Sequence, residues 1–141
     1  MNAQPAGHRH FHDELSELKV ALLNMSGEAQ AALGAAVDAV LQRDGDKAGE
    51  VIAGDKEIDQ LELDVEEKVI RLLATQQPMA RDLRFLTAAM KIANDLERVG
   101  DHAVNIAQSA ERLLVNRPIV PEPELVEMVR QARTKIGRAH V

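Results

Sequence analysis

Residues 11–40 read FHDELSELKVALLNMSGEAQAALGAAVDAV, and this stretch decides the fold class. Its apolar residues recur at steps of three and four, which is the spacing of a helix that packs along one face. The members of this seam are Phe11, Leu15, Leu18, Leu22, Met25, Ala29, Ala32, Ala36 and Val40. Only Gly27 and Gly34 weaken it, each by about 1 kcal/mol relative to alanine. We therefore predict one long helix that ends at the turn formed by residues 43–46.

The same reading extends toward the C-terminus. A second helix is predicted over residues 46–75, and Pro78 suits the first turn of a third helix that reaches residue 116. Three long helices joined by short turns must run antiparallel. The predicted fold is therefore all-α: an antiparallel three-helix bundle over residues 11–116, preceded by a flexible N-terminus (1–10) and followed by an incomplete fourth helix.

The composition agrees with helices and excludes several classes of protein. The chain has 141 residues, enough for one compact domain. Its residues are 45% hydrophobic but only 1% aromatic, so aliphatic side chains must fill the core, as suits packed helices. Cysteine is absent, which excludes disulfides and thiolate metal sites.

The charge and the N-terminus bear on partners and location. A formal net charge of −6 argues against a nucleic-acid partner held by phosphate contacts. The first ten residues, MNAQPAGHRH, contain no signal-peptide pattern, and no apolar run is long enough to span a membrane. We therefore expect a cytoplasmic protein with no direct membrane span.

The C-terminal quarter indicates a truncated chain. Residues 117–123 (RPIVPEP) predict a stiff, proline-rich linker, and residues 124–134 begin the fourth helix. This helix either packs on the bundle or is the first helix of a missing second bundle. Residues 135–141 (KIGRAHV) are similar to read-through into a sequencing adapter, so we predict a non-native tail; the alternative is an ordinary polar terminus.

The second helix carries a stripe of carboxylates along the edge of its core face. At about 100° per residue, its four members fall within about 60° of one another. They are Asp55, Asp59, Glu62 and Glu66. The same azimuth turns apolar toward both ends of the helix, at Ala48, Val51, Val69 and Leu73. An ordinary solvated face would not be bracketed in this way.

The third helix repeats the arrangement with Glu97 and Asp101, and Asn105 lies near them. Its predicted core face comprises Phe85, Leu96, Ala103, Ala107 and Leu114. Asp59 lies 18 residues before Gln77 and Glu97 lies 20 after it, so an antiparallel hairpin places the carboxylates at one height. Gly100, directly before Asp101, thins the surface beside the carboxylates and permits close approach to them.

Crowded carboxylates repel one another, so we predict that metal ions neutralise them. All-oxygen ligands suit hard ions such as Mg²⁺, Mn²⁺, Ca²⁺ or iron. The predicted ligands are Asp55, Asp59, Glu97 and Asp101, and wheel geometry alone adds Glu62, Glu66 and Asn105. The alternative is a solvated acidic face neutralised by nearby cations, namely Lys56, Lys68, Arg84 and Arg98.

Three stretches carry a resemblance to a known family. Residues 95–107 (DLERVGDHAVNIA) resemble the signature of the PhoU family, accessory regulators of phosphate-specific transport. Residues 55–59 (DKEID) and 72–84 (LLATQQPMARDLR) fit the same family, as does the opening around Phe11. The likeness runs without a break from about residue 11 to residue 116.

The resemblance implies two tandem three-helix bundles, each able to hold a multinuclear metal cluster of iron, zinc, manganese or magnesium. The family's motif positions match Asp55, Asp59, Glu97 and Asp101, and residues 124–134 would begin the second repeat. It also implies a negative regulator of the phosphate-starvation response that contacts the phosphate ABC transporter ATPase and a phosphate-sensing histidine kinase. A homodimer of the full-length protein, peripheral at the inner membrane through its partners, is expected.

Other functions compete with this one. A ferritin-like di-metal enzyme needs Glu-x-x-His pairs, and no glutamate here has a histidine three residues later. No nucleophile or base motif indicates a hydrolase, so we predict that the chain is not an enzyme. A metal-free structural or adaptor bundle, and a PhoU-like domain of a sodium–phosphate cotransporter, remain as alternatives.

Overall fold

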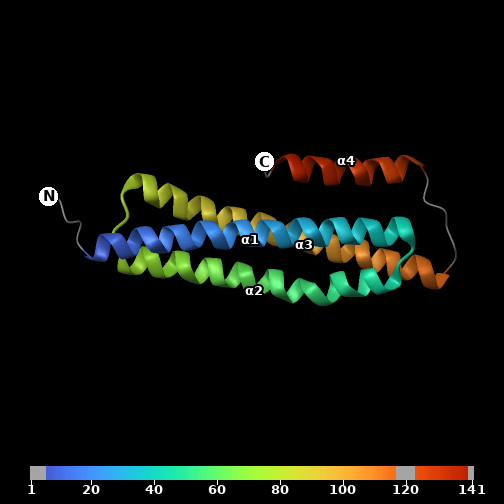
Figure 1. The fold of residues 1–141 in the computed structure, drawn as a ribbon, viewed down its shortest axis with the longest axis horizontal. Helices are drawn as coiled ribbons and strands as arrows, with labels where there is room; N and C mark the ends of the chain where they lie inside the picture. The colour runs from blue at the N-terminus through green and yellow to red at the C-terminus, as the bar shows by residue number, and fades with distance from the viewer. Residues whose placement is uncertain (1–5, 117–122, 140–141) are drawn as a thin grey trace.

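The computed structural model describes residues 6–116 and 123–139, which form four α-helices and no strand. They are α1 (Ala6–Gln42), α2 (Gly45–Thr75), α3 (Ala80–Asn116) and α4 (Pro123–Ala139). The first three form the predicted antiparallel bundle, up-down-up, and α4 returns beside α1 (Figure 1). None of the described helices is both long enough and apolar enough to cross a membrane.

The turn between α1 and α2 lies where the sequence predicts it. Arg43 adopts a positive φ of 53°, and the Asp44 N–H donates to the Ala39 carbonyl at 3.0 Å. This arrangement ends a helix by satisfying its last carbonyls. Asp44 then caps α2, because its Oδ1 accepts the backbone N–H of Lys47 at 3.1 Å. One short turn therefore reverses the chain.

The α2–α3 turn differs slightly from the prediction. Helix α2 ends at Thr75 as predicted, and the Gln76 N–H donates to the Leu72 carbonyl at 3.0 Å. Helix α3 begins at Ala80, so Pro78 precedes it instead of lying in its first turn. The reason is that the Met79 carbonyl accepts the N–H of Leu83 at 2.9 Å, which makes Met79 the flanking residue of the helix.

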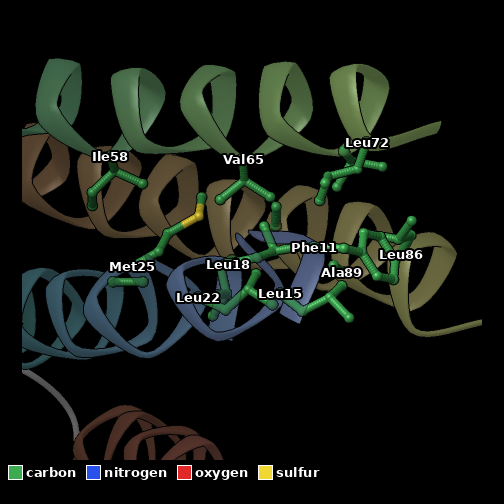
Figure 2. Close-up of a cluster of buried hydrophobic side chains, with 14 residues drawn as sticks. Phe11, Leu15, Leu18, Leu22, Met25, Ile58, Val65, Leu72, Leu86 and Ala89 are labelled. Atoms are coloured by element: carbon green, nitrogen blue, oxygen red, sulfur yellow. The ribbon is translucent and has the colours of Figure 1, made fainter. Parts of the chain in front are cut away.

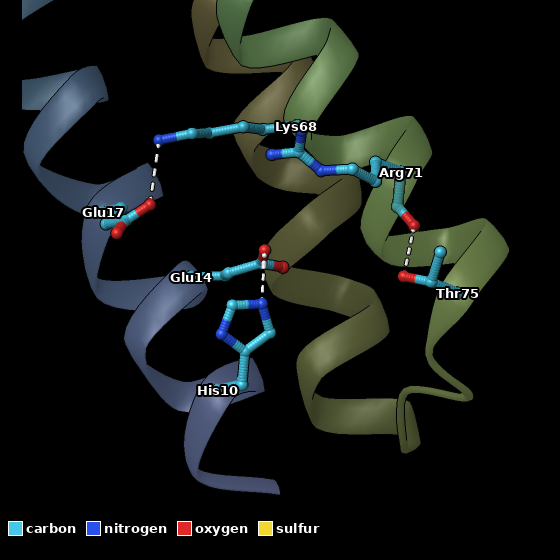
Figure 3. A network of polar contacts seen from close by, with 6 residues as sticks. All are labelled: His10, Glu14, Glu17, Lys68, Arg71 and Thr75. Atoms are coloured by element: carbon cyan, nitrogen blue, oxygen red, sulfur yellow. Dashed lines mark hydrogen bonds and ion pairs between the residues drawn. The ribbon is translucent and has the colours of Figure 1, made fainter. Parts of the chain in front are cut away.

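The N-terminal boundary was also predicted wrongly. Helix α1 begins at Ala6, so residues 6–10 are helical and not a flexible lead-in. This extra turn is linked to the next by His10, whose Nε2 lies 3.1 Å from Glu14 Oε1, one helical turn away (Figure 3). Residues 1–5, most of the predicted linker (117–122) and the last two residues lie outside the described ranges.

The larger core cluster occupies the half of the bundle near the α2–α3 turn (Figure 2). Helix α1 supplies the predicted seam, in which Leu18 and Met25 have no exposed surface. The buried members of the cluster are Phe11, Leu15, Leu18, Leu22, Met25, Ala29, Ile58, Val65, Val69, Leu72, Leu86, Ala89, Ala93 and Leu96. Because they come from all three helices, this cluster holds the helices in register.

The second cluster, at the opposite end, is built mainly of small side chains. Its buried members are Leu33, Ala36, Ala39, Ala48, Val51, Ala103, Ala107 and Ala110. Leu114 was predicted to join the core but is 44% exposed. It lies near the end of α3 against the α1–α2 turn, where the Gly45 Cβ position is 3.1 Å from Leu114 Cδ1, so only one side of it is covered.

Helix α4 packs on the bundle along α1. Arg133 Nη1 pairs with Asp38 Oδ1 at 3.2 Å, and Ile136 packs against the second core cluster. A largely apolar cavity of about 560 Å³ remains between α4, α1 and α3. The fourth helix thus runs through residues 135–139, which were predicted to be non-native; their origin stays a prediction.

Candidate metal centre

Three aspartates from two helices converge on one point of the bundle surface. Asp55 and Asp59 lie one turn apart on α2, and Asp101 comes from the antiparallel α3. One carboxylate oxygen from each lies within 4.8 Å of the others. The spacing on either side of the α2–α3 turn predicts carboxylates at one height, and these three residues agree with that prediction.

The close approach of α2 and α3 depends on Gly100. A Cβ placed on Gly100 would lie 3.2 Å from Asp55 Oδ1 and 3.3 Å from two methyl groups of Ile58. Both distances are shorter than ordinary van der Waals contacts. The missing side chain lets Asp55 approach α3 and so brings the carboxylates of the two helices together.

We expect Gly100→Val to lower the free energy of unfolding by about 1–3 kcal/mol, because its methyl groups would overlap Ile58 and Asp55. Urea denaturation measures the change. The matched control is Gly27→Val on α1, since a Cβ there meets nothing within 4 Å. Equal losses in both variants would show that helix propensity, and not the α2–α3 contact, sets the effect.

Glu97 adjoins the three aspartates. Burial, a hydrogen bond with Asp101 and the charges of Asp101, Glu62 and Asp59 together raise the pKa of Glu97 from 4.5 to about 7. Protonated Glu97 would donate that hydrogen bond, since ionised carboxylates only accept. Four carboxyl groups from α2 and α3 therefore share one electrostatic environment around Glu97.

Two further observations show that negative charge here is incompletely compensated. Burial and the charges of Asp59 and Asp101 raise the pKa of Asp55, and burial with the charges of Glu66, Asp59 and Asp101 raises that of Glu62. Asp55 Oδ1 and Glu62 Oε2 are buried without a hydrogen-bond partner. Buried polar atoms ordinarily have partners, so these two oxygens lack the partner that a bound cation could supply.

The cations proposed in the solvated-face alternative do not neutralise this cluster. Lys68 pairs instead with Glu17 of α1 at 3.3 Å (Figure 3). Among the side chains described in residues 10–115 and 123–136, Lys68 with Glu17 and Arg133 with Asp38 form ion pairs, and neither pair includes a cluster carboxylate. The acidic cluster thus lacks a protein counter-charge in this part of the chain.

The donor set fits a hard cation. Asp55, Asp59 and Asp101 offer carboxylate oxygens alone, the ligands that magnesium, calcium, manganese and iron accept. Glu97 and Glu62 stand beside them. The charge of Glu66 raises the pKa of Glu62. Asn105 lines the cavity beneath α4, together with His102. Coordination by any of these residues stays a prediction.

Wheel geometry alone predicts Glu62 as a weaker candidate, yet its carboxylate adjoins the cluster as closely as that of Glu97 does in its effect on charge. One oxygen of Glu62 is buried without a partner, and its charge contributes to the raised pKa of Glu97. The stripe Asp55–Asp59–Glu62 was visible in the sequence. Which of its oxygens lose contact with water depends on the packing of α3.

Comparisons with known proteins agree with this architecture. A family model described as PhoU domain matches residues 22–110. The chain is 43% identical over 108 residues to the phosphate-specific transport system accessory protein PhoU homolog of Aquifex aeolicus, covering 77% of this chain and 49% of that protein. The Caulobacter vibrioides protein of the same name is 42% identical over 100 residues, covering 71% of this chain and 44% of that protein.

A solved structure extends the likeness to three dimensions. The crystal structure of PhoU from Pseudomonas aeruginosa matches with a TM-score of 0.82 at 32% identity, covering 92% of this chain and 61% of that one. The chain spans about half the length of the curated relatives that it matches.

Proposed function

The chain belongs to the PhoU family, and from this premise we propose that it is a metal-binding regulator of phosphate uptake and not an enzyme. The relatives are named as accessory proteins of the phosphate-specific transport system, which supports a regulatory role. The observation that carries the metal-binding part is the convergence of Asp55, Asp59 and Asp101 around partnerless buried oxygens.

In this proposal Asp55, Asp59, Glu97 and Asp101 hold the metal, with Glu62 and Glu66 as further candidates beside them. Bound ions supply positive charge, which would offset the repulsion among these carboxylates. Asp59 and Asp101 are exposed on the surface of the bundle. A bound metal ion would therefore change the charge of that surface. A surface whose charge depends on metal occupancy is suited to recognition of another protein.

We further propose the partners and the direction of regulation. The chain would contact the phosphate ABC transporter ATPase and a phosphate-sensing histidine kinase, and would repress the phosphate-starvation response when phosphate is plentiful. It would act in the cytoplasm, peripheral to the inner membrane through these contacts, and would dimerise as part of the full-length protein. The relatives are named as accessory proteins of a transport system, which supports action through contacts with other proteins.

Metal analysis of the purified chain tests the central claim. We expect the parent to carry metal, and Asp59→Ala and Asp101→Ala to carry close to none, because each removes one of three converging ligands. The control is Asp64→Ala, an exposed carboxylate on α2 that hydrogen-bonds Gln60 outside the cluster. Equal metal content in all four proteins would exclude the site.

Two readouts separate this proposal from a metal-free adaptor. Metal that binds only the folded chain raises its melting temperature, so a chelator should lower the Tm of the parent but not of Asp101→Ala. In a strain that lacks the full-length gene, the parent should restore repression of a phosphate-starvation reporter, and the two cluster variants should fail. Repression that survives in both variants would favour the metal-free alternative.

A further inference from the structure

The cavity between α1, α3 and α4 lies outside the proposed metal centre. Its volume of about 560 Å³ is typical of pockets that bind small molecules. Leucine, isoleucine, valine and alanine side chains of the three helices form most of its lining. Protein interiors contain few spaces larger than a water molecule, and those lined by apolar groups stay dry. The cavity is therefore suited to an apolar ligand.

The cavity is elongated along the helices. Helix α4 runs antiparallel to α1 and α3 (Figure 1), so Leu125 at its start lies at the same end of the cavity as Leu41 and Leu113. On α4 the lining extends from Leu125 to Ile136, a rise of about 16 Å at 1.5 Å per residue. A single hydrocarbon chain suits a space of this length, whereas a compact ligand would leave part of it empty.

One edge of the cavity is polar, and its polar residues all come from α3. They are His102, Asn105 and Ser109, of which His102 and Asn105 are exposed, so this edge opens to solvent. The Ser109 hydroxyl donates to the Asn105 backbone carbonyl at 2.9 Å and accepts from Arg112 at 3.4 Å, which leaves it one lone pair. The Asn105 side-chain amide can both donate and accept. A small head group can thus form hydrogen bonds here while its chain stays among aliphatic side chains.

Helix α4 is held loosely enough to admit such a ligand. None of its described side chains, in residues 123–136, is fully buried. It is fastened by the partly exposed Arg133–Asp38 ion pair and by Ile136, which packs against the second core cluster. The Arg133 guanidinium lies over Gly34, where a Cβ would be 3.3 Å from Nη2. Because an exposed ion pair contributes little stability, α4 can leave the bundle and return.

We propose that this cavity binds a single aliphatic chain with a small oxygen-containing head group, as in a medium-chain fatty acid or its monoglyceride. The chain lies between α1, α3 and α4, and the head group lies at Asn105 and Ser109. The bound ligand fills the space beneath α4 and so fixes this helix on the bundle. This inference goes beyond the proposed function and does not depend on bound metal.

Titration calorimetry with decanoic acid and with monodecanoylglycerol, each below its micelle concentration, measures binding to the purified chain. We expect saturable, equimolar binding of at least one of them, and the comparison decides between a carboxylate and a hydroxyl head group. Hydrogen exchange of the α4 amides should slow about tenfold or more at saturation, because the ligand binds only while α4 is seated.

Filling the cavity should compete with the ligand. Val129→Trp on α4 and Ile106→Trp on α3 each place an indole in the space of the chain, from opposite walls, and should weaken binding about tenfold or more. The matched control is Val20→Trp on α1, which is 56% exposed and outside the cavity, and it should bind within about twofold of the parent. Circular dichroism and hydrogen exchange without ligand verify that each variant is folded and keeps α4 seated.

The position of the head group has its own test. Asn105→Leu combined with Ser109→Val removes the polar groups and should weaken binding about fivefold, since the head group loses its hydrogen bonds. Four results would overturn the proposal: no saturable binding of either probe, equal affinity of the parent and both tryptophan variants, α4 exchange that the ligand leaves unchanged, and unchanged affinity in the Asn105–Ser109 double variant. Binding of many probe molecules per chain, alike in all variants, would indicate surface adsorption and would also exclude the site.

Discussion

Replacing Leu18 with alanine is expected to lower the free energy of unfolding by about 2–5 kcal/mol. Leu18 has no exposed surface and lies in the larger core cluster, where side chains from α1, α2 and α3 meet (Figure 2). The truncation removes buried methyl groups and leaves a space that straight, packed helices fill poorly. Urea denaturation followed by circular dichroism measures the change, because unfolding of the bundle removes its helical signal.

The matched control is Leu23→Ala on the same helix. Leu23 is 72% exposed, so its truncation should change the free energy of unfolding by about 0.5 kcal/mol or less. Both variants have the same change in helix propensity, and only the burial of the side chain differs. A comparable loss in the two variants would mean that α1 does not pack on α2 and α3 through the seam described here.

The fold could be predicted from the spacing of apolar residues because each long helix has one buried face. The seam from Phe11 to Ala36 is buried apart from Ala32, which is half-buried. The polar turn at Arg43–Asp44 and the proline at position 78 marked the reversals. In a bundle of this kind the order of helices and the lengths of the turns leave only the antiparallel arrangement.

The boundaries that were wrong depended on contacts that periodicity does not encode. The extra turn of α1 precedes Phe11, the first apolar residue of the seam, and joins the rest through the His10–Glu14 pair. The start of α3 depended on which carbonyl accepts the first helical hydrogen bond. Leu114 has the azimuth of a core residue, but it lies too near the end of α3 to be covered.

The spacing of the sequence could predict that aspartates of α2 and α3 meet, but not the electrostatics around them. Spacing alone placed Asp55, Asp59 and Asp101 at one height, and the three oxygens converge there. The sequence could not decide between metal and nearby cations, because the pairing of Lys68 with Glu17 depends on how α1 packs against α2. It also could not show which oxygens are buried without partners, since the contact at Gly100 sets that.

In the metal-free chain, the free energy of unfolding is expected to fall as the pH rises from about 4.5 to about 7. Glu97 sets this window, because its folded-state pKa of about 7 lies above the ordinary value of 4.5. Between these values the folded chain binds more protons than the unfolded chain, so stability decreases with pH. The shift corresponds to roughly 3 kcal/mol at most, and solvent screening reduces it.

Asp55 and Glu62 contribute in the same direction, since burial and neighbouring carboxylates raise the pKa of each. Urea denaturation in the presence of a chelator at several pH values measures the slope. Glu97→Gln should flatten it, because the amide carries no charge in either state, whereas Glu50→Gln on the exposed surface of α2 should leave it unchanged. Added metal should oppose the trend, because ions bind the ionised carboxylates and favour the folded chain at higher pH. A parent and a Glu97→Gln variant with equal slopes would mean that these carboxyl groups are not crowded in solution, which would remove the electrostatic reason for a metal centre between α2 and α3.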